Sequence, residues 1–153
     1  MRLDDLDRRI LASLADDARR SYAQIGAEVS LSAPAVKRRV DRLRRDGVIQ
    51  RFTAVVDPAS VGWTTEAFVE VFCERRTSPS DLAAIAQRLP EVVAGYTVTG
   101  EADAMLHLRT SDIRHLEQVL ERIRDEPAVS QTRSTVVLSR LVDRAAQPRV
   151  VGP

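Results

Sequence analysis

A short basic segment with one apolar edge, residues 32–47, most constrains how this chain can fold. On a helical period three apolar side chains share one side of the segment and three arginines lie roughly opposite. The apolar residues are Val36, Val40 and Leu43, and the arginines are Arg38, Arg42 and Arg45. Residues 31–51 hold seven basic and two acidic side chains, a net charge of +5, whereas the whole chain carries +1. Such a concentration favours a polyanion such as DNA, although a solvated helix with charge pairs would show the same pattern.

The segments on either side of the basic segment favour the DNA-binding interpretation. An aspartate at position 4 or 5 can cap a first helix, and a Ser-x-x-Gln capping box at Ser21 predicts a second helix. A turn follows, and Ser32 is expected to cap the basic helix. The β-prone residues 48–56 predict a strand that would form a wing. The first part of the chain is therefore predicted to be a winged helix-turn-helix.

In a helix-turn-helix, the N-terminal residues of the second helix reach base edges in the major groove. Phosphate contacts fix register and affinity, whereas base contacts fix sequence preference. The residues expected at the start of that helix and nearest the bases are Ser32, Ala33, Pro34, Lys37 and Arg38. Those expected to contact phosphates are Arg42, Arg45 and Arg51.

The second half of the chain alternates predicted strands and helices in the order βαββαβ, which is typical of a ferredoxin-like sheet with both helices on one face. The predicted strands cover residues 67–74, 92–99, 104–109 and 130–141, and the predicted helices cover 80–89 and the segment from 111 or 112 to 123. The expected fold class is therefore α+β.

The first of these strands is apolar on both faces. Val69, Val71 and Cys73 alternate with Phe68 and Phe72. Because the helices cover only one face of such a sheet, the other face would expose two phenylalanines to water. We therefore expect a homodimer in which two sheets pack face to face.

The predicted domains are a DNA-binding domain at 1–62, a ferredoxin-like domain at 63–141 and a tail at 142–153. Residues 1–64 carry a net charge of +3 and residues 65–153 a net charge of −2, which directs only the first half to nucleic acid. The single cysteine excludes an internal disulfide, and no Cys/His cluster indicates a metal site. No apolar run reaches the length of a membrane span, so we expect no membrane partner and a cytoplasmic location.

The order of these elements over residues 3–141 resembles the Lrp/AsnC (leucine-responsive regulatory protein, feast/famine) family of transcription regulators. The residues that carry the resemblance are Leu6 to Leu11, Leu31-Ser32 with Val36, Arg39, Val40 and Leu43, Gly47-Val48-Ile49, Val98-Thr99-Gly100 with Asp103, and Thr132 to Val137. The resemblance implies a DNA-binding winged helix joined to an effector-sensing ferredoxin-like (RAM/ACT-like) domain. It also implies dimers that assemble into tetramers or octamers.

The resemblance further implies that an amino-acid effector binds between subunits, near the turn at residues 100–103. Gly100 would let backbone N–H groups approach the ligand, and Asp103 could accept a charge-assisted bond from its ammonium group. The other residues expected at this site are Thr97, Thr99, Glu101, Ala102, Ser134 and Thr135. An ordinary hairpin turn would show the same Gly-x-x-Asp pattern.

This chain has Ala102 and Ala104 where family members often carry aromatic residues beside the aspartate. The pocket is then either roomier or no longer binds a ligand. Besides an effector-responsive regulator, two alternatives stay open. They are a ligand-independent DNA-architectural protein and a sirohaem-decarboxylase-like enzyme on the same scaffold. His107 and His115 are isolated and form no obvious catalytic pair. We therefore expect no enzyme activity, no catalytic residues, no metal and no cofactor besides the amino-acid effector.

Overall fold

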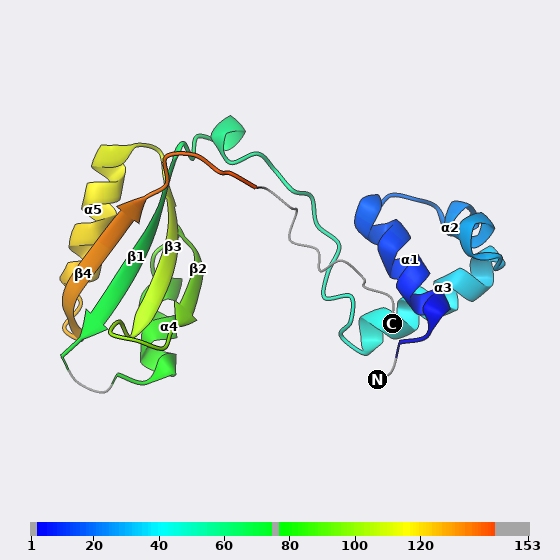
Figure 1. Ribbon diagram of the computed structural model, residues 1–153, viewed down its shortest axis with the longest axis horizontal. Helices are drawn as coiled ribbons and strands as arrows, with labels where there is room; N and C mark the ends of the chain where they lie inside the picture. The colour runs from blue at the N-terminus through cyan, green and yellow to red at the C-terminus, as the bar shows by residue number, and fades with distance from the viewer. Residues whose placement is uncertain (1–2, 75–76, 143–153) are drawn as a thin grey trace. The chain divides into compact units, whose positions relative to one another are not determined.

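The computed structural model describes residues 3–74 and 77–142, which form two compact units that divide between Val55 and Val56 (Figure 1). The predicted domain boundary between residues 62 and 63 lies inside the second unit. The predicted tail, apart from residue 142, lies outside the described residues. Among the described residues, no helix combines the length and apolarity that a membrane crossing requires.

The first unit contains three helices, α1 (Asp5–Asp16), α2 (Tyr22–Val29) and α3 (Ala33–Arg45). Two predicted caps are confirmed, because Asp4 and Ser21 each accept a hydrogen bond from the backbone N–H three residues on, in complete capping boxes. The prediction for Ser32 is wrong in one respect. Ser32 stands at the N-cap of α3, but its side chain makes no capping hydrogen bond.

The turn between α2 and α3 depends on the absence of a side chain at Gly26. The Leu31 N–H donates to the Gly26 carbonyl oxygen at 2.9 Å. A Cβ at position 26 would lie 2.3 Å from the Leu31 carbonyl oxygen, which no real side chain tolerates. The close approach of these two backbones fixes how α3 leaves α2.

The three helices bury one shared apolar core. Each contributes side chains at helical spacing, and these residues are almost inaccessible to water. They are Ile10 and Leu14 from α1, Ile25 and Val29 from α2, and Val36 and Val40 from α3. Burial of the apolar edge of α3 leaves its basic side exposed, as the sequence pattern predicts.

The predicted wing is not formed. Residues 48–56 contain no strand in the structure. The segment is β-prone, but a strand requires a neighbouring strand, and no described strand pairs with these residues. The Val48 and Ile49 N–H groups instead donate to the Leu43 carbonyl oxygen at the end of α3. Val55 and Phe52 are instead exposed to solvent.

The second unit is a four-stranded antiparallel sheet with the strand order β2-β3-β1-β4, accompanied by two helices (Figure 1). A short 3₁₀ turn, η1 (Ala59–Val61), precedes the sheet. The elements are β1 (Thr65–Cys73), α4 (Pro79–Gln87), β2 (Val92–Thr97), β3 (Ala104–Thr110), α5 (Ile113–Arg124) and β4 (Val129–Val136). The predicted βαββαβ order is therefore confirmed.

Several boundaries differ from the prediction by one or two residues, and the end of β4 differs by five. Strand β4 ends at Val136, not at residue 141, because β1 begins at Thr65 and offers few backbone groups beyond the Glu66 carbonyl oxygen, which accepts from the Val137 N–H at 2.8 Å. Helix α4 begins at Pro79, and its cap is Ser78, whose side chain accepts from the Asp81 N–H.

Both helices cover the same face of the sheet. The buried strand residues Ala67, Val69 and Val71 alternate along β1 and meet apolar side chains from α4 and α5. The opposite face carries Phe68, which is 38% exposed. The predicted asymmetry of the sheet is confirmed, with one face covered by helices and the other open in the single chain.

A buried carboxylate ties α5 to the start of β2. The Glu91 residue is 5% exposed, and its Oε1 accepts from Arg122 at 2.5 Å and lies 2.9 Å from His115 Nε2. Burial alone would raise the pKa of Glu91, but the bonds from Arg122 and His115 outweigh it and hold that pKa below its usual range. The ionised form therefore stabilises the fold.

Truncation of Leu108 to alanine is expected to destabilise the second unit by about 2–5 kcal/mol, because Leu108 is 0% exposed and a cavity would remain in its place. Urea unfolding followed by circular dichroism measures the change. Ile113→Ala is the matched control, since Ile113 is 60% exposed and its truncation should cost far less. An equal decrease in the free energy of unfolding for the two variants would contradict the assigned core.

The contribution of Glu91 should depend on pH. Because its folded pKa is depressed, the stabilisation is present above the usual carboxyl pKa of about 4.5 and disappears as the pH falls through the lower folded value. Glu91→Gln should therefore lower the free energy of unfolding at pH 7, and the gap to wild type should narrow at pH 3. A gap that stays constant between these pH values would contradict the assignment. Glu117→Gln, at an exposed position of α5, is the control.

Candidate functional site

The exposed side of α3 is a basic stripe. The solvent-exposed residues of the helix are Pro34, Lys37, Arg38, Arg44 and Arg45. Lys37 Nζ lies 2.7 Å from Asp41 Oδ2, and the Arg44 guanidinium lies 5.8 Å from the centroid of the Phe52 ring. Within the described residues, Arg38 and Arg45 form no salt bridge. These two arginines are therefore the cations of α3 with the fewest competing contacts.

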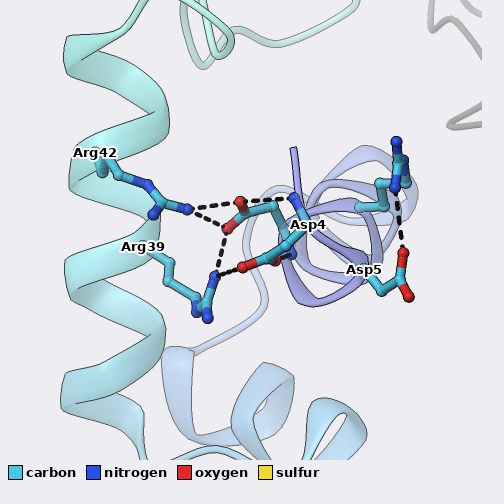
Figure 2. Close-up of polar contacts among 6 residues, drawn as sticks. Asp4, Asp5, Arg39 and Arg42 are labelled. Carbon is cyan, nitrogen blue, oxygen red and sulfur yellow. Dashed lines mark hydrogen bonds and ion pairs between the residues drawn. The ribbon is translucent and has the colours of Figure 1, made fainter. Parts of the chain in front are cut away.

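Arg42 has different contacts from those expected. Its Nη2 donates to both carboxylate oxygens of Asp7 in α1, at 2.6 Å each. Figure 2 shows the Arg42 side chain directed toward the start of α1, away from the rest of α3. Arg42 was predicted to contact phosphate; in the structure it forms an ion pair with a buried carboxylate, and its side chain is 41% exposed.

Arg39 lies in the same cluster as Arg42 (Figure 2). Its Nη1 donates to Asp4 Oδ2 at 2.7 Å and to Asp7 Oδ1 at 2.8 Å. The Arg39 bond lowers the pKa of Asp4, and the two carboxylates raise the pKa of Arg39. Asp4 and Arg39 are therefore charged at neutral pH, and their charges offset each other.

Sequence reasoning missed this cluster. The spacing of Asp4 and Asp7 at the start of a predicted helix fits a capping box and could have been recognised. No local pattern, however, connects Asp7 to arginines that lie 32 and 35 residues further along the chain.

The second candidate site is a hollow of about 720 Å³ on the sheet, beside the turn between β2 and β3. Five of the expected effector residues line it, namely Thr97, Thr99, Gly100, Glu101 and Ala102. Gly100 has a φ of +127°, a backbone conformation that L side chains rarely adopt, so the turn requires glycine here.

Asp103 does not line the hollow. Its Oδ2 accepts from the Cys73 N–H at 2.8 Å, and its own N–H donates to the Val71 carbonyl oxygen at 2.9 Å. Asp103 therefore holds the turn against the end of β1, which is a structural task. Its expected contact with an ammonium group stays a prediction.

The two hydroxyls expected from β4 lie on opposite faces of the sheet. Ser134 pairs with the buried Val69, so it shares the helix-covered face, whereas Thr135 pairs with Phe68 on the open face. Neither residue lines the hollow. A one-residue step along a strand reverses the side chain, and the sequence pattern alone did not reveal which hydroxyl would face which way.

Two of the three charged groups of the hollow, Arg133 and Glu70, come from residues that the sequence analysis did not expect at this site, whereas Glu101 was expected there. Arg133 Nη1 lies 3.2 Å from Glu70 Oε2, and its guanidinium lies 5.4 Å from the centroid of the Phe72 ring. Glu101 Oε2 is 4.0 Å from Arg133 Nη2. The hollow therefore offers one cation, two carboxylates and an apolar wall that also includes Met105.

The remainder of the open face is partly aromatic. Phe68 stacks on His107 with 4.7 Å between the ring centroids. Glu66 borders this pair through contacts with His107 and Arg140. In the part of the chain that the structure describes, no three His, Cys, Asp or Glu side chains gather as a metal site.

Two family models match the chain in the same order as the two units. Residues 3–44 match the AsnC-type helix-turn-helix domain, and residues 66–147 match the Lrp/AsnC ligand binding domain. The first match contains all three helices of the first unit except the last residue of α3, and the second begins within β1.

Known proteins of this type are similar along nearly their whole length. The HTH-type transcriptional regulator Rv2324 of Mycobacterium tuberculosis is 57% identical over 143 residues, which cover 94% of this chain and 97% of that protein. The M. tuberculosis feast or famine regulatory protein complexed with L-methionine is 35% identical, with a TM-score of 0.87 over 95% of this chain and 99% of that one. The L-methionine complex of the Neisseria meningitidis regulator NMB0573 is 27% identical, with a TM-score of 0.88 over 96% and 97%.

The helix-turn-helix with its basic exposed stripe, the βαββαβ sheet and these similarities agree with one another. The chain belongs to the Lrp/AsnC family of DNA-binding transcriptional regulators.

Proposed function

We propose that this regulator binds near-palindromic DNA as a homodimer and that an amino acid at the hollow beside Gly100 alters this binding. The observation that carries the proposal is the pairing, in one chain, of an exposed cationic recognition helix with a separate hollow that holds charges of both signs. In this proposal the regulator acts on DNA in the cytoplasm and performs no catalysis.

The N-terminal half of α3 reads base edges in this proposal. The base-reading residues are Ser32, Ala33, Pro34, Lys37 and Arg38, and the phosphate contacts are Arg45 and Arg51. The exposure of Arg38 and Arg45 supports these roles, and the Asp7 contact of Arg42 removes that residue from the set. A dimer presents two such helices, so the spacing of its half-sites follows from the dimer.

The open face of the sheet supports the homodimer. A second copy packed on this face would remove Phe68 from water, which is 38% exposed in the single chain. Tetramers or octamers of such dimers follow from the family resemblance. An effector bound between subunits can shift the assembly only by binding one arrangement more tightly than another.

The hollow is suited to a zwitterionic amino acid. Arg133 can hold the ligand carboxylate, and Glu70 or Glu101 can accept from its ammonium group in charge-assisted bonds. Thr97 and Thr99 add hydroxyls at the same hollow, and L-methionine complexes of two structural neighbours support an amino acid as the ligand class.

A DNA-binding protein without an effector is the second candidate. Two observations favour it, namely the use of Asp103 to hold the turn and the small side chains of Ala102 and Ala104 beside it.

Two alanine variants test the DNA contact. Arg38→Ala should weaken binding by about 1–3 kcal/mol and relax the preference at one base position. Arg45→Ala should weaken binding on all sequences and reduce the salt slope by about 0.9, since one phosphate contact is lost. Fluorescence anisotropy across a salt series measures both effects. Arg114→Ala, an exposed arginine of α5, is the control, and variants that all bind like wild type would refute the assignment of α3.

Calorimetric titration with each of the twenty amino acids tests the effector. Wild type should release or absorb heat with at least one of them. Arg133→Gln should weaken that ligand about tenfold or more, because a hydrogen bond to a charged group contributes about 1.5–3 kcal/mol. The absence of heat with every amino acid would reject the effector and favour the ligand-independent candidate.

A further inference from the structure

Asp7 is a buried acidic residue of α1, a helix that is not expected to contact DNA. Its side chain is 1% exposed, and a carboxylate buried to that extent is costly unless hydrogen bonds and opposite charges surround it. Asp7 accepts from the Asp4 N–H at 3.3 Å, from Arg39 and twice from Arg42. Both oxygens of the carboxylate are therefore fully engaged.

The two arginines depend on Asp7 to different degrees. Arg39 has a second partner, because its Nη1 also donates to Asp4 at 2.7 Å. Within the described residues, every hydrogen bond that the Arg42 side chain donates goes to Asp7, and Arg42 Nε is buried without a partner. Loss of the Asp7 charge would thus release Arg42, whereas Arg39 would stay with Asp4.

The cluster changes the charge that the recognition helix presents. Arg39 and Arg42 account for two of the seven basic side chains in residues 31–51, and the charges of Asp4 and Asp7 cancel them. Lys37 is paired with Asp41. The exposed arginines Arg38, Arg44 and Arg45 are then the main cations of α3 toward DNA.

We propose that Asp7 is a positioning residue for DNA recognition, which holds the Arg42 guanidinium against α1 and so limits the number of phosphates that α3 contacts. This inference rests on the proposed DNA contact of α3. Affinity for any DNA sequence grows with the number of cations that meet phosphates, because each contact releases counterions. By retaining Arg42, Asp7 lowers sequence-independent binding and leaves the discrimination to the base-reading end of the helix.

Anisotropy titrations across a salt series, on a duplex selected by the wild-type protein and on a scrambled duplex of equal composition, test the proposal. Asp7→Asn should steepen the salt slope on both duplexes by about 0.9, the value for one added phosphate contact. It should also tighten binding to the scrambled duplex more than to the selected one, so the ratio of the two affinities falls. The double variant Asp7→Asn/Arg42→Gln should return the slope to the wild-type value.

Asp4→Asn is the matched control, since it removes the same charge three residues away and leaves Asp7 in contact with both arginines. Its slope should equal that of wild type. An unchanged slope for Asp7→Asn, or an equal change for the two aspartate variants, would overturn the proposal.

A third variant keeps the test decisive if Asp7→Asn fails to fold. Arg42→Gln alone should bind with the wild-type slope, because Arg42 does not reach DNA in the wild-type protein. A slope reduced by about 0.9 would show that Arg42 contacts phosphate and would overturn the proposal. Arg45→Ala distinguishes failure of the Asp7 proposal from failure of the proposed DNA contact of α3. If Arg45→Ala leaves the salt slope unchanged, the contact of α3 with DNA is itself wrong.

Discussion

The contact of Asp7 with Arg39 and Arg42 connects the architecture of the first unit with its electrostatics. The carboxylate belongs to the capping box that begins α1, and the arginines belong to the flank of α3. The apolar core under the three helices fixes where α3 lies, and the ion pairs fix which of its charges face the protein. A helix that reads as uniformly basic in sequence therefore presents only part of that charge to a partner.

In the second unit, the corresponding constraint is the coverage of one sheet face. Helices α4 and α5 pack on the face of Val69 and Val71, and the open face keeps aromatic and charged side chains together. The hollow lies at one end of this open face, where Glu70 and Arg133 meet the turn at Gly100. A homodimer through this face would place the proposed effector hollow next to the subunit interface, which would link ligand binding to the geometry of assembly.

Periodicity predicted most of the fold because each element has a clear apolar stripe or alternation. The caps at Asp4 and Ser21 and the order of strands and helices are confirmed for that reason. The wing at 48–56 was not formed, since β-propensity cannot supply a neighbouring strand. The candidate sites were harder to predict, because the partners of Arg42 and Arg133 lie far away in sequence, and the face that Ser134 and Thr135 occupy depends on strand register.

The most direct test of the account is a gel-shift titration on the DNA immediately upstream of this protein's own gene, at fixed salt, with and without pooled amino acids. We expect a sequence-specific shift, at protein concentrations that leave random DNA unbound, and a change in that shift when amino acids are present. Binding that does not distinguish the upstream DNA from random DNA would contradict the central claim. A specific shift that no amino acid alters would retain the DNA-binding regulator and reject the proposed effector.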